Sequence, residues 1–117
     1  MITRSKDLRI SEHDKLRDGN GKIYMKHFME EADSGGTGRL FVMATIPPGS
    51  SIGPHTHVGD FDAYYVLDGN VEVTDNGVPG TLAPGDFMIC KDGDSHSVEN
   101  KSDKDAKIIM LVIYARK

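Results

Sequence analysis

The sequence contains a single cysteine, Cys90, and no tryptophan among its 117 residues. One cysteine cannot form a disulfide within the chain, so the composition predicts a protein of the reducing cytoplasm. No segment approaches the roughly 20 apolar residues that a membrane-spanning helix needs, and the longest apolar run covers only residues 108–115. The opening residues MITRSKDLRI have no apolar segment typical of a secretion signal. We therefore expect no membrane among the partners.

Basic residues are fewer than acidic ones. The chain has 14 Lys and Arg against 18 Asp and Glu, which gives a formal net charge of −4. This balance argues against nucleic acid as a partner. The length fits one domain, and the 38% of hydrophobic residues suffice for one core. A domain of this size gains stability by closing its sheet or by pairing with a second copy.

Glycine is abundant, with 13 residues, and together with 5 prolines it divides the chain into short segments. Asn76-Gly77 between two such segments is a strong hairpin signal, because both turn positions require a positive φ. Strand-length segments separated by turns predict an all-β sandwich or barrel. The predicted strands cover residues 40–46, 63–67, 71–74, 81–82, 87–90, 95–99 and 107–115.

The chain divides into an N-terminal segment, residues 1–35, and a barrel, residues 36–117. The N-terminal segment is polar at first and is predicted to supply edge strands or an arm that pairs with a second subunit, with one helical turn at 27–33. Uncovered edge strands can pair across a two-fold axis, so we expect a homodimer.

Two of the five histidines, His55 and His57, are two residues apart. On a strand such residues point to the same face with Cα atoms about 6.6 Å apart, so two imidazoles can converge on one ion. His96 follows on a separate strand that a closed sheet could bring opposite the pair. His13 and His27 are expected to be ordinary surface histidines.

A carboxylate also follows the histidine pair. Asp60 and Asp62 are the candidates, and Gly59 permits a bulge that leaves strand counting undecided between them. Asp62 is favoured because it opens the apolar strand 63–67.

These residues resemble the two motifs of the cupin superfamily. The first motif, G-x5-H-x-H-x(3,4)-E-x6-G, is matched by Gly49, His55, His57, Asp62 in the Glu position, and Gly69. The second motif, G-x5-P-x-G-x2-H-x3-N, is matched by Gly85, Lys91 in place of Pro, Gly93, His96 and Asn100. Eight of the ten motif positions agree, and their spacing holds from Gly49 to Asn100.

The resemblance implies a double-stranded β-helix, or jelly roll, with a metal ion inside its mouth. The implied ligands are His55, His57, His96 and Asp62, a set that suits Fe, Mn, Ni, Co or Zn as divalent ions. Asp is one methylene shorter than Glu. Asp62 therefore either shifts inward, binds through a water, or does not bind.

Three further residue types bear on the pocket. If Asp62 points inward, Tyr64 shares its face and either donates a hydrogen bond to a ligand, as the candidate catalytic residue, or packs in a half-buried strand. Cys90 is expected to be a small buried hydrophobe, with a position facing the cavity as the alternative. The methionines, including Met43, Met88 and Met110, are expected in the core.

The favoured function is a metal-dependent oxygenase, isomerase or lyase that acts on a small polar metabolite. The alternatives are a non-catalytic protein that binds or senses a sugar-like small molecule, and a storage or stress protein with a structural metal. Open coordination positions that face a cavity would favour catalysis.

Overall fold

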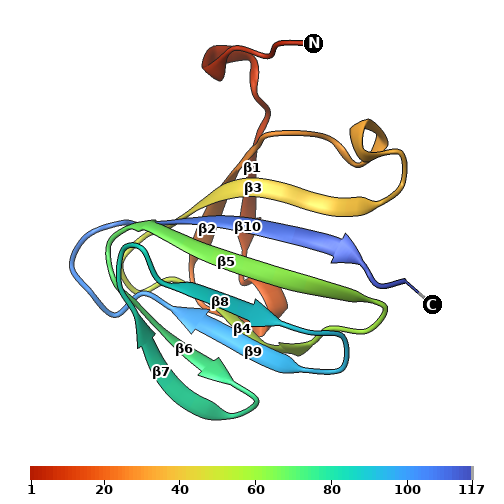
Figure 1. The fold of residues 1–117 in the computed structure, drawn as a ribbon. Helices are drawn as coiled ribbons and strands as arrows, with labels where there is room; N and C mark the ends of the chain where they lie inside the picture. Colours follow the sequence, from red (N-terminus) through yellow and green to blue (C-terminus); the bar gives the residue numbers. More distant parts are fainter. Residues whose placement is uncertain (117) are drawn as a thin grey trace.

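The computed structural model describes residues 1–116, which form two antiparallel β-sheets (Figure 1). The strands are β1 (Ile10–Asp14), β2 (Lys22–His27), β3 (Gly38–Ile46), β4 (Ser51–Thr56), β5 (Asp60–Asp68), β6 (Val71–Asp75), β7 (Val78–Leu82), β8 (Phe87–Cys90), β9 (Ser95–Glu99) and β10 (Ala106–Tyr114). The helical segments that the described residues contain are short 3-10 turns: η1 (Ser5–Asp7), η2 (Leu16–Asp18) and η3 (Glu31–Ser34). The predicted all-β class is confirmed.

The order of the strands is that of a double-stranded β-helix. One sheet runs β1-β2-β3-β10-β5-β8 and the other runs β4-β9-β6-β7. From β3 onward the chain alternates between the two sheets, with β6 and β7 forming a hairpin at Asn76-Gly77. Both turn residues have a positive φ, 49° and 81°, as the sequence predicts. The jelly-roll prediction is therefore confirmed.

The first 35 residues contribute two strands to the larger sheet. β1 pairs with β2, and β2 pairs with β3 through Tyr24↔Thr45 to His27↔Val42. The predicted helical turn at 27–33 is only partly right, because His27 still belongs to β2 and the turn lies at Glu31–Ser34. We call the unit formed by β1, η2 and β2, residues 10–27, the N-terminal hairpin.

The core lies between the sheets and takes every second residue of the long strands. Val42, Ala44 and Ile46 of β3 are fully buried, and Phe41, Met43 and Thr45 face outward. Met88 and Met110 are buried as predicted. The placement of Met43 in the core is wrong, because the alternation of β3 turns it to the outer face, where it is half-buried.

Within residues 1–116, the structure contains no helix with the length and apolar character to cross a membrane.

Candidate metal centre

Four side chains converge inside the barrel: His55, His57, Asp62 and His96. We call them the donor cluster. His55 on β4 is paired directly with His96 on β9 across the smaller sheet. His57 follows β4, where its backbone N–H donates to the carbonyl of Asp94 at 3.0 Å. Asp62 lies on the inward face of β5 in the larger sheet. Both sheets thus contribute donors to one point.

The separations within the donor cluster suit a cation. His96 Nε2 lies 3.1 Å from His57 Nε2 and 3.0 Å from His55 Nε2. Asp62 Oδ2 lies 3.3 Å from His57 Nε2 and 3.4 Å from His96 Nε2. Donors bonded to a central ion at about 2.1 Å are about 3.0 Å apart in an octahedron and about 3.4 Å apart in a tetrahedron. The four separations given above match these edge lengths, and all the donor atoms lie within 4.8 Å of one another, so the donor cluster is able to hold a metal ion.

Hydrogen bonds on the far side of two rings set their tautomers. His55 Nδ1 lies 2.8 Å from the carbonyl of Gly53, which can only accept, so Nδ1 carries the proton. His57 Nδ1 lies 2.6 Å from Asp60 Oδ1, a carboxylate that holds a proton on Nδ1 in the same way. When the rings are neutral, each Nε2 therefore carries a lone pair that faces the donor cluster. Such outer partners are usual for metal-binding histidines.

The buried side chain of Asp62 supplies the negative charge of the donor cluster. Burial of Asp62 acts to raise its pKa, but hydrogen bonds with His57 and His96 outweigh burial and lower the pKa below the ordinary value. Asp62 therefore stays ionised although only 6% of it is exposed. Its Oδ1 and the Nδ1 of His96 are buried and have no hydrogen-bond partner among the described residues. A buried carboxylate of this kind is stabilised by a cation.

The pKa values of the two neighbouring histidines shift in opposite directions. The hydrogen bond with Asp62 raises the pKa of His57, and Asp60 adds to the effect. Burial lowers the pKa of His55, and the nearby His96, His57 and Arg17 contribute in the same direction. The donor cluster thus contains two different imidazoles. His57, which lies beside carboxylates, readily carries positive charge, whereas His55 stays neutral.

Asp60 has a different role from Asp62. It lies behind His57 and also accepts from Arg39, whose Nη2 is 3.1 Å from Asp60 Oδ2. This arrangement resolves the choice that the sequence left open: Asp62 joins the donor cluster, and Asp60 orients His57 from behind.

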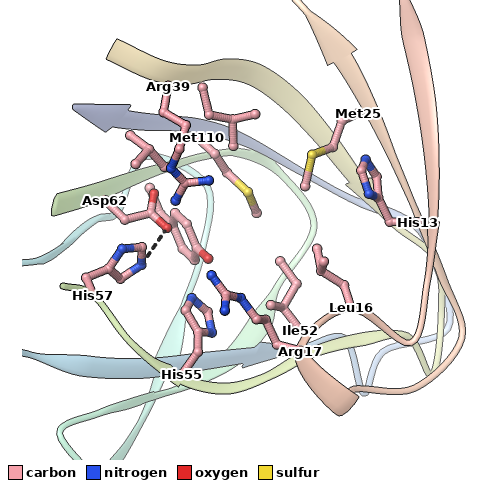
Figure 2. Close-up of a pocket in the computed structure, with 13 residues that line it drawn as sticks. His13, Leu16, Arg17, Met25, Arg39, Ile52, His55, His57, Asp62 and Met110 are labelled. Atoms are coloured by element: carbon pink, nitrogen blue, oxygen red, sulfur yellow. Dashed lines mark ion pairs between the residues drawn. The ribbon is translucent and has the colours of Figure 1, made fainter. Parts of the chain in front are cut away.

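A cavity of about 160 Å³ opens beside the donor cluster. Figure 2 shows His55, His57 and Asp62 at one end of it and Met25, His13 and Leu16 at the other. Pockets that hold drug-sized ligands measure about 300–1,000 Å³, so this cavity suits a much smaller molecule.

Tyr64 is buried in the core and also contributes to the cavity wall. It is 1% exposed, and its ring centroid lies 4.9 Å from that of His96, so it packs in the core. It also lines the cavity. Burial, together with the Asp62 carboxylate, raises the pKa of Tyr64 well above its ordinary value, so the hydroxyl remains protonated and acts as a hydrogen-bond donor.

Two arginines that the sequence did not predict as site residues line the cavity. Figure 2 shows the guanidinium groups of Arg17 and Arg39 turned toward the cavity from different walls. Arg17 lies in η2 and Arg39 in β3, both before the first motif. No spacing signal connects them to the histidines, because only the folded chain brings these segments together.

The expectation of a surface residue is wrong for His27, whereas His13 is half-buried. His27 is buried, and His13 lines the cavity. Ser11 Oγ lies 2.8 Å from the Nε2 atoms of both rings. Arg9 Nη2, which can only donate, lies 3.2 Å from His27 Nδ1, so His27 carries its proton on Nε2 and donates to Ser11. Ser11 in turn donates to His13.

Cys90 is fully buried, as expected of a small hydrophobe. Burial, with the nearby Asp62 and other carboxylates, raises the pKa of its thiol to about 11. The thiol therefore stays protonated and unreactive.

Fold and site together define a small β-barrel with an interior cluster able to hold a divalent metal. Residues 42–114 match the family described as Cupin domain, and the chain belongs to this family. The resemblance noted in the two histidine motifs is thus confirmed.

Similar proteins carry names that refer to oxalate. An oxalate-binding protein of Thermotoga maritima is 34% identical over 113 residues, which cover 97% of this chain and 93% of the relative. The crystal structure of a predicted oxalate decarboxylase from Thermotoga maritima has a TM-score of 0.92 at 33% identity, covering 98% of this chain and 100% of that one.

A third comparison concerns the fold alone. The cupin domain of a transcriptional regulator of the XRE family from Enterobacter cloacae has a TM-score of 0.68 at 19% identity, covering 80% of this chain and 98% of that one.

Proposed function

We propose that the protein binds a divalent transition metal through the donor cluster and uses it to bind and decarboxylate a small carboxylate such as oxalate. The observation that carries the proposal is the convergence of three imidazoles and one buried carboxylate beside a small cavity. Fe, Mn, Ni, Co and Zn as divalent ions all accept such donors. A metal bound there would supply Lewis acidity toward a carboxylate oxygen.

The chain's own residues suit an anionic ligand. The guanidinium groups of Arg17 and Arg39 add positive charge to the cavity walls, and the protonated hydroxyl of Tyr64 can donate to a carboxylate oxygen. The apolar side chains of Leu16, Met25 and Ile52 restrict water around the ligand. The names of the two Thermotoga relatives support oxalate as the first compound to test.

A metal-content experiment tests the first half of the proposal. Wild type, His55→Ala and His96→Ala are purified in parallel, loaded with Mn²⁺ or Zn²⁺, dialysed, and analysed for bound metal. We expect about one metal per wild-type chain and little in either variant. Equal metal content in all three proteins would contradict the proposal.

A turnover experiment tests the second half. Decarboxylation of oxalate takes up one proton and yields formate and CO₂ in equal amounts. We expect the metal-loaded protein to produce both from oxalate, and Tyr64→Phe, which removes only the hydroxyl, to turn over more slowly with unchanged metal content. Measuring O₂ consumption in the same samples tests the oxygenase alternative.

The second candidate function is binding without turnover, as the name of the oxalate-binding relative indicates. It is favoured if the metal-loaded protein binds oxalate in calorimetry but releases no CO₂ over many hours. Loss of oxalate binding after metal removal would then still locate the ligand at the donor cluster.

A further inference from the structure

The wall of the cavity that faces the donor cluster is built by the N-terminal hairpin. Its lining residues are His13 from β1, Leu16 and Arg17 from η2, and Met25 from β2. All four precede residue 42, where the match to the cupin domain begins. The candidate metal donors therefore belong to the family's barrel, whereas the opposite wall belongs to a segment outside the matched residues.

Among the residues that the structure describes, Arg17 is a cation of this wall without a counter-ion. Within residues 1–116 its guanidinium forms no ion pair and no side-chain hydrogen bond, whereas Arg39 is paired with Asp60. Figure 2 shows the Arg17 guanidinium pointing into the cavity near His55.

The backbone that carries Arg17 is held in an uncommon conformation. Lys15, Arg17 and Asp18 have φ values of 52°, 54° and 60°, a left-handed region that residues other than glycine rarely occupy. Such strain persists only where the surrounding structure imposes it, and it concentrates at ligand-binding sites.

Contacts with β4 impose this conformation. Ser51 on β4 accepts from the backbone N–H of Asn20 through Oγ and donates its own N–H to the Asn20 carbonyl, both at 2.8 Å. A methyl group at Gly53 would overlap the carbonyl oxygen of Arg17. Because β4 also carries His55, one strand positions both Arg17 and part of the donor cluster.

We propose that Arg17 is the specificity-determining residue of the cavity and selects a small dianion, with one carboxylate at the donor cluster and the other on its guanidinium. This inference rests on the proposed function and goes beyond it, because it assigns recognition of the second carboxylate to the N-terminal hairpin. A guanidinium suits this task because its fixed fork of N–H donors can bind a carboxylate through two hydrogen bonds.

Calorimetric titration of the Mn²⁺-loaded protein with oxalate and with formate tests the proposal. The variants are Arg17→Gln, Arg17→Lys, and Lys15→Gln, which removes a charge from the same turn outside the cavity. We expect Arg17→Gln to weaken oxalate binding by about 10-fold or more, the range for a charge-assisted pair. Arg17→Lys should weaken it less. Formate binding and metal content should stay near the wild-type values in all variants. Oxalate binding by Lys15→Gln should also stay near the wild-type value.

Each other outcome has a distinct meaning. If wild type binds oxalate and Arg17→Gln binds it equally well, the role of Arg17 is refuted while the proposed function stands. If Lys15→Gln and Arg17→Gln weaken oxalate binding equally, general electrostatic attraction replaces a specific contact, which also refutes the inference. If metal-loaded wild type binds neither oxalate nor formate, the proposed function itself fails.

Discussion

Asp60 and Asp62 are two residues apart on β5, and both are buried, yet they contact different groups. Asp62 lies against the Nε2 atoms of His57 and His96, whereas Asp60 lies against His57 Nδ1 and Arg39. The bend at Gly59, with φ of 81°, brings His57 between them. Asp60 thus holds the His57 ring at Nδ1, while Nε2 on the opposite side of the ring faces Asp62.

We expect Asp60→Ala to weaken metal binding without removing a donor. The variant leaves His57 free to rotate and to change tautomer, and losing such an outer partner typically costs 10–100-fold in affinity. Competition with a metal-binding dye measures the change. Asp68→Ala, which removes an exposed carboxylate that contacts Lys104 and the backbone N–H of Gly69, is the control. Equal affinities for Asp60→Ala and wild type would rule out this positioning role.

His27 gives a pH-dependent contribution to stability that is independent of the donor cluster. Burial lowers its pKa below 6.5; Arg9 and His13 act in the same direction, and Glu30 opposes them. The unfolded chain therefore takes up a proton on His27 at a higher pH than the folded chain does. Its contribution to stability is complete above about pH 6.5 and is lost as the pH falls toward the lowered folded value.

The corresponding measurement compares thermal unfolding of metal-free wild type and His27→Gln between about pH 7.5 and pH 5. We expect the melting temperature of the wild type to fall more steeply with decreasing pH, because the glutamine does not titrate. The donor-cluster histidines are present in both proteins, so their titration cancels in the comparison. Parallel curves would contradict the prediction.

At the scale of elements, β4 connects the two halves of the cavity. Its backbone packs directly against the turn of the N-terminal hairpin, and the two glycines at this contact, Gly19 and Gly53, leave no space for a Cβ atom. The first motif therefore depends on the hairpin for its surroundings, although the two are far apart in the sequence.

We expect Gly53→Ala to destabilise the protein by about 1–3 kcal/mol, the usual cost of overpacking. The added methyl group must displace the carbonyl of Arg17. Oxalate binding should also weaken, because Arg17 moves with its turn. Urea unfolding and calorimetry measure the two effects. Gly80→Ala is the matched control, because a methyl group there meets only Val73 at an ordinary 3.7 Å.

At the scale of the whole molecule, the outer face of the larger sheet is rich in apolar side chains. Phe87, Tyr65, Ile109 and Met43 are successive cross-strand partners on β8, β5, β10 and β3. Phe87 is 60% exposed and Tyr65 is 44% exposed. The first residues of the chain extend beyond the sheets in Figure 1, with Met1 and Ile2 exposed.

We expect a homodimer in solution, because apolar surface on a sheet face and uncovered edge strands both favour pairing with a second copy. Light scattering at micromolar concentration should report about twice the mass of one chain. Phe87→Glu places a charge on the apolar row and should shift the equilibrium toward the monomer, whereas Val78→Glu, on the smaller sheet, should not. A monomeric wild type would contradict the prediction.

The local sequence determined the barrel and the position of its candidate donors. Glycine and proline residues in the turns predicted the short strands, and the resemblance of the two histidine motifs to a known family implied that His55, His57 and His96 converge. These features depend on backbone geometry within one strand or turn, and on the two motifs that resemble those of the family. They could therefore be deduced before any tertiary contact was known.

Only the tertiary structure decided which face of each strand is inside and which distant segments meet. Strand alternation divides Met43 from Val42 but does not say which one is buried. The pairing of Asp60 with His57 Nδ1, the burial of His27 and the approach of Arg17 to the cavity likewise depend on how the sheets and the N-terminal hairpin pack. Sequence periodicity carries no information about such contacts, because they join segments whose separation along the chain follows no fixed spacing.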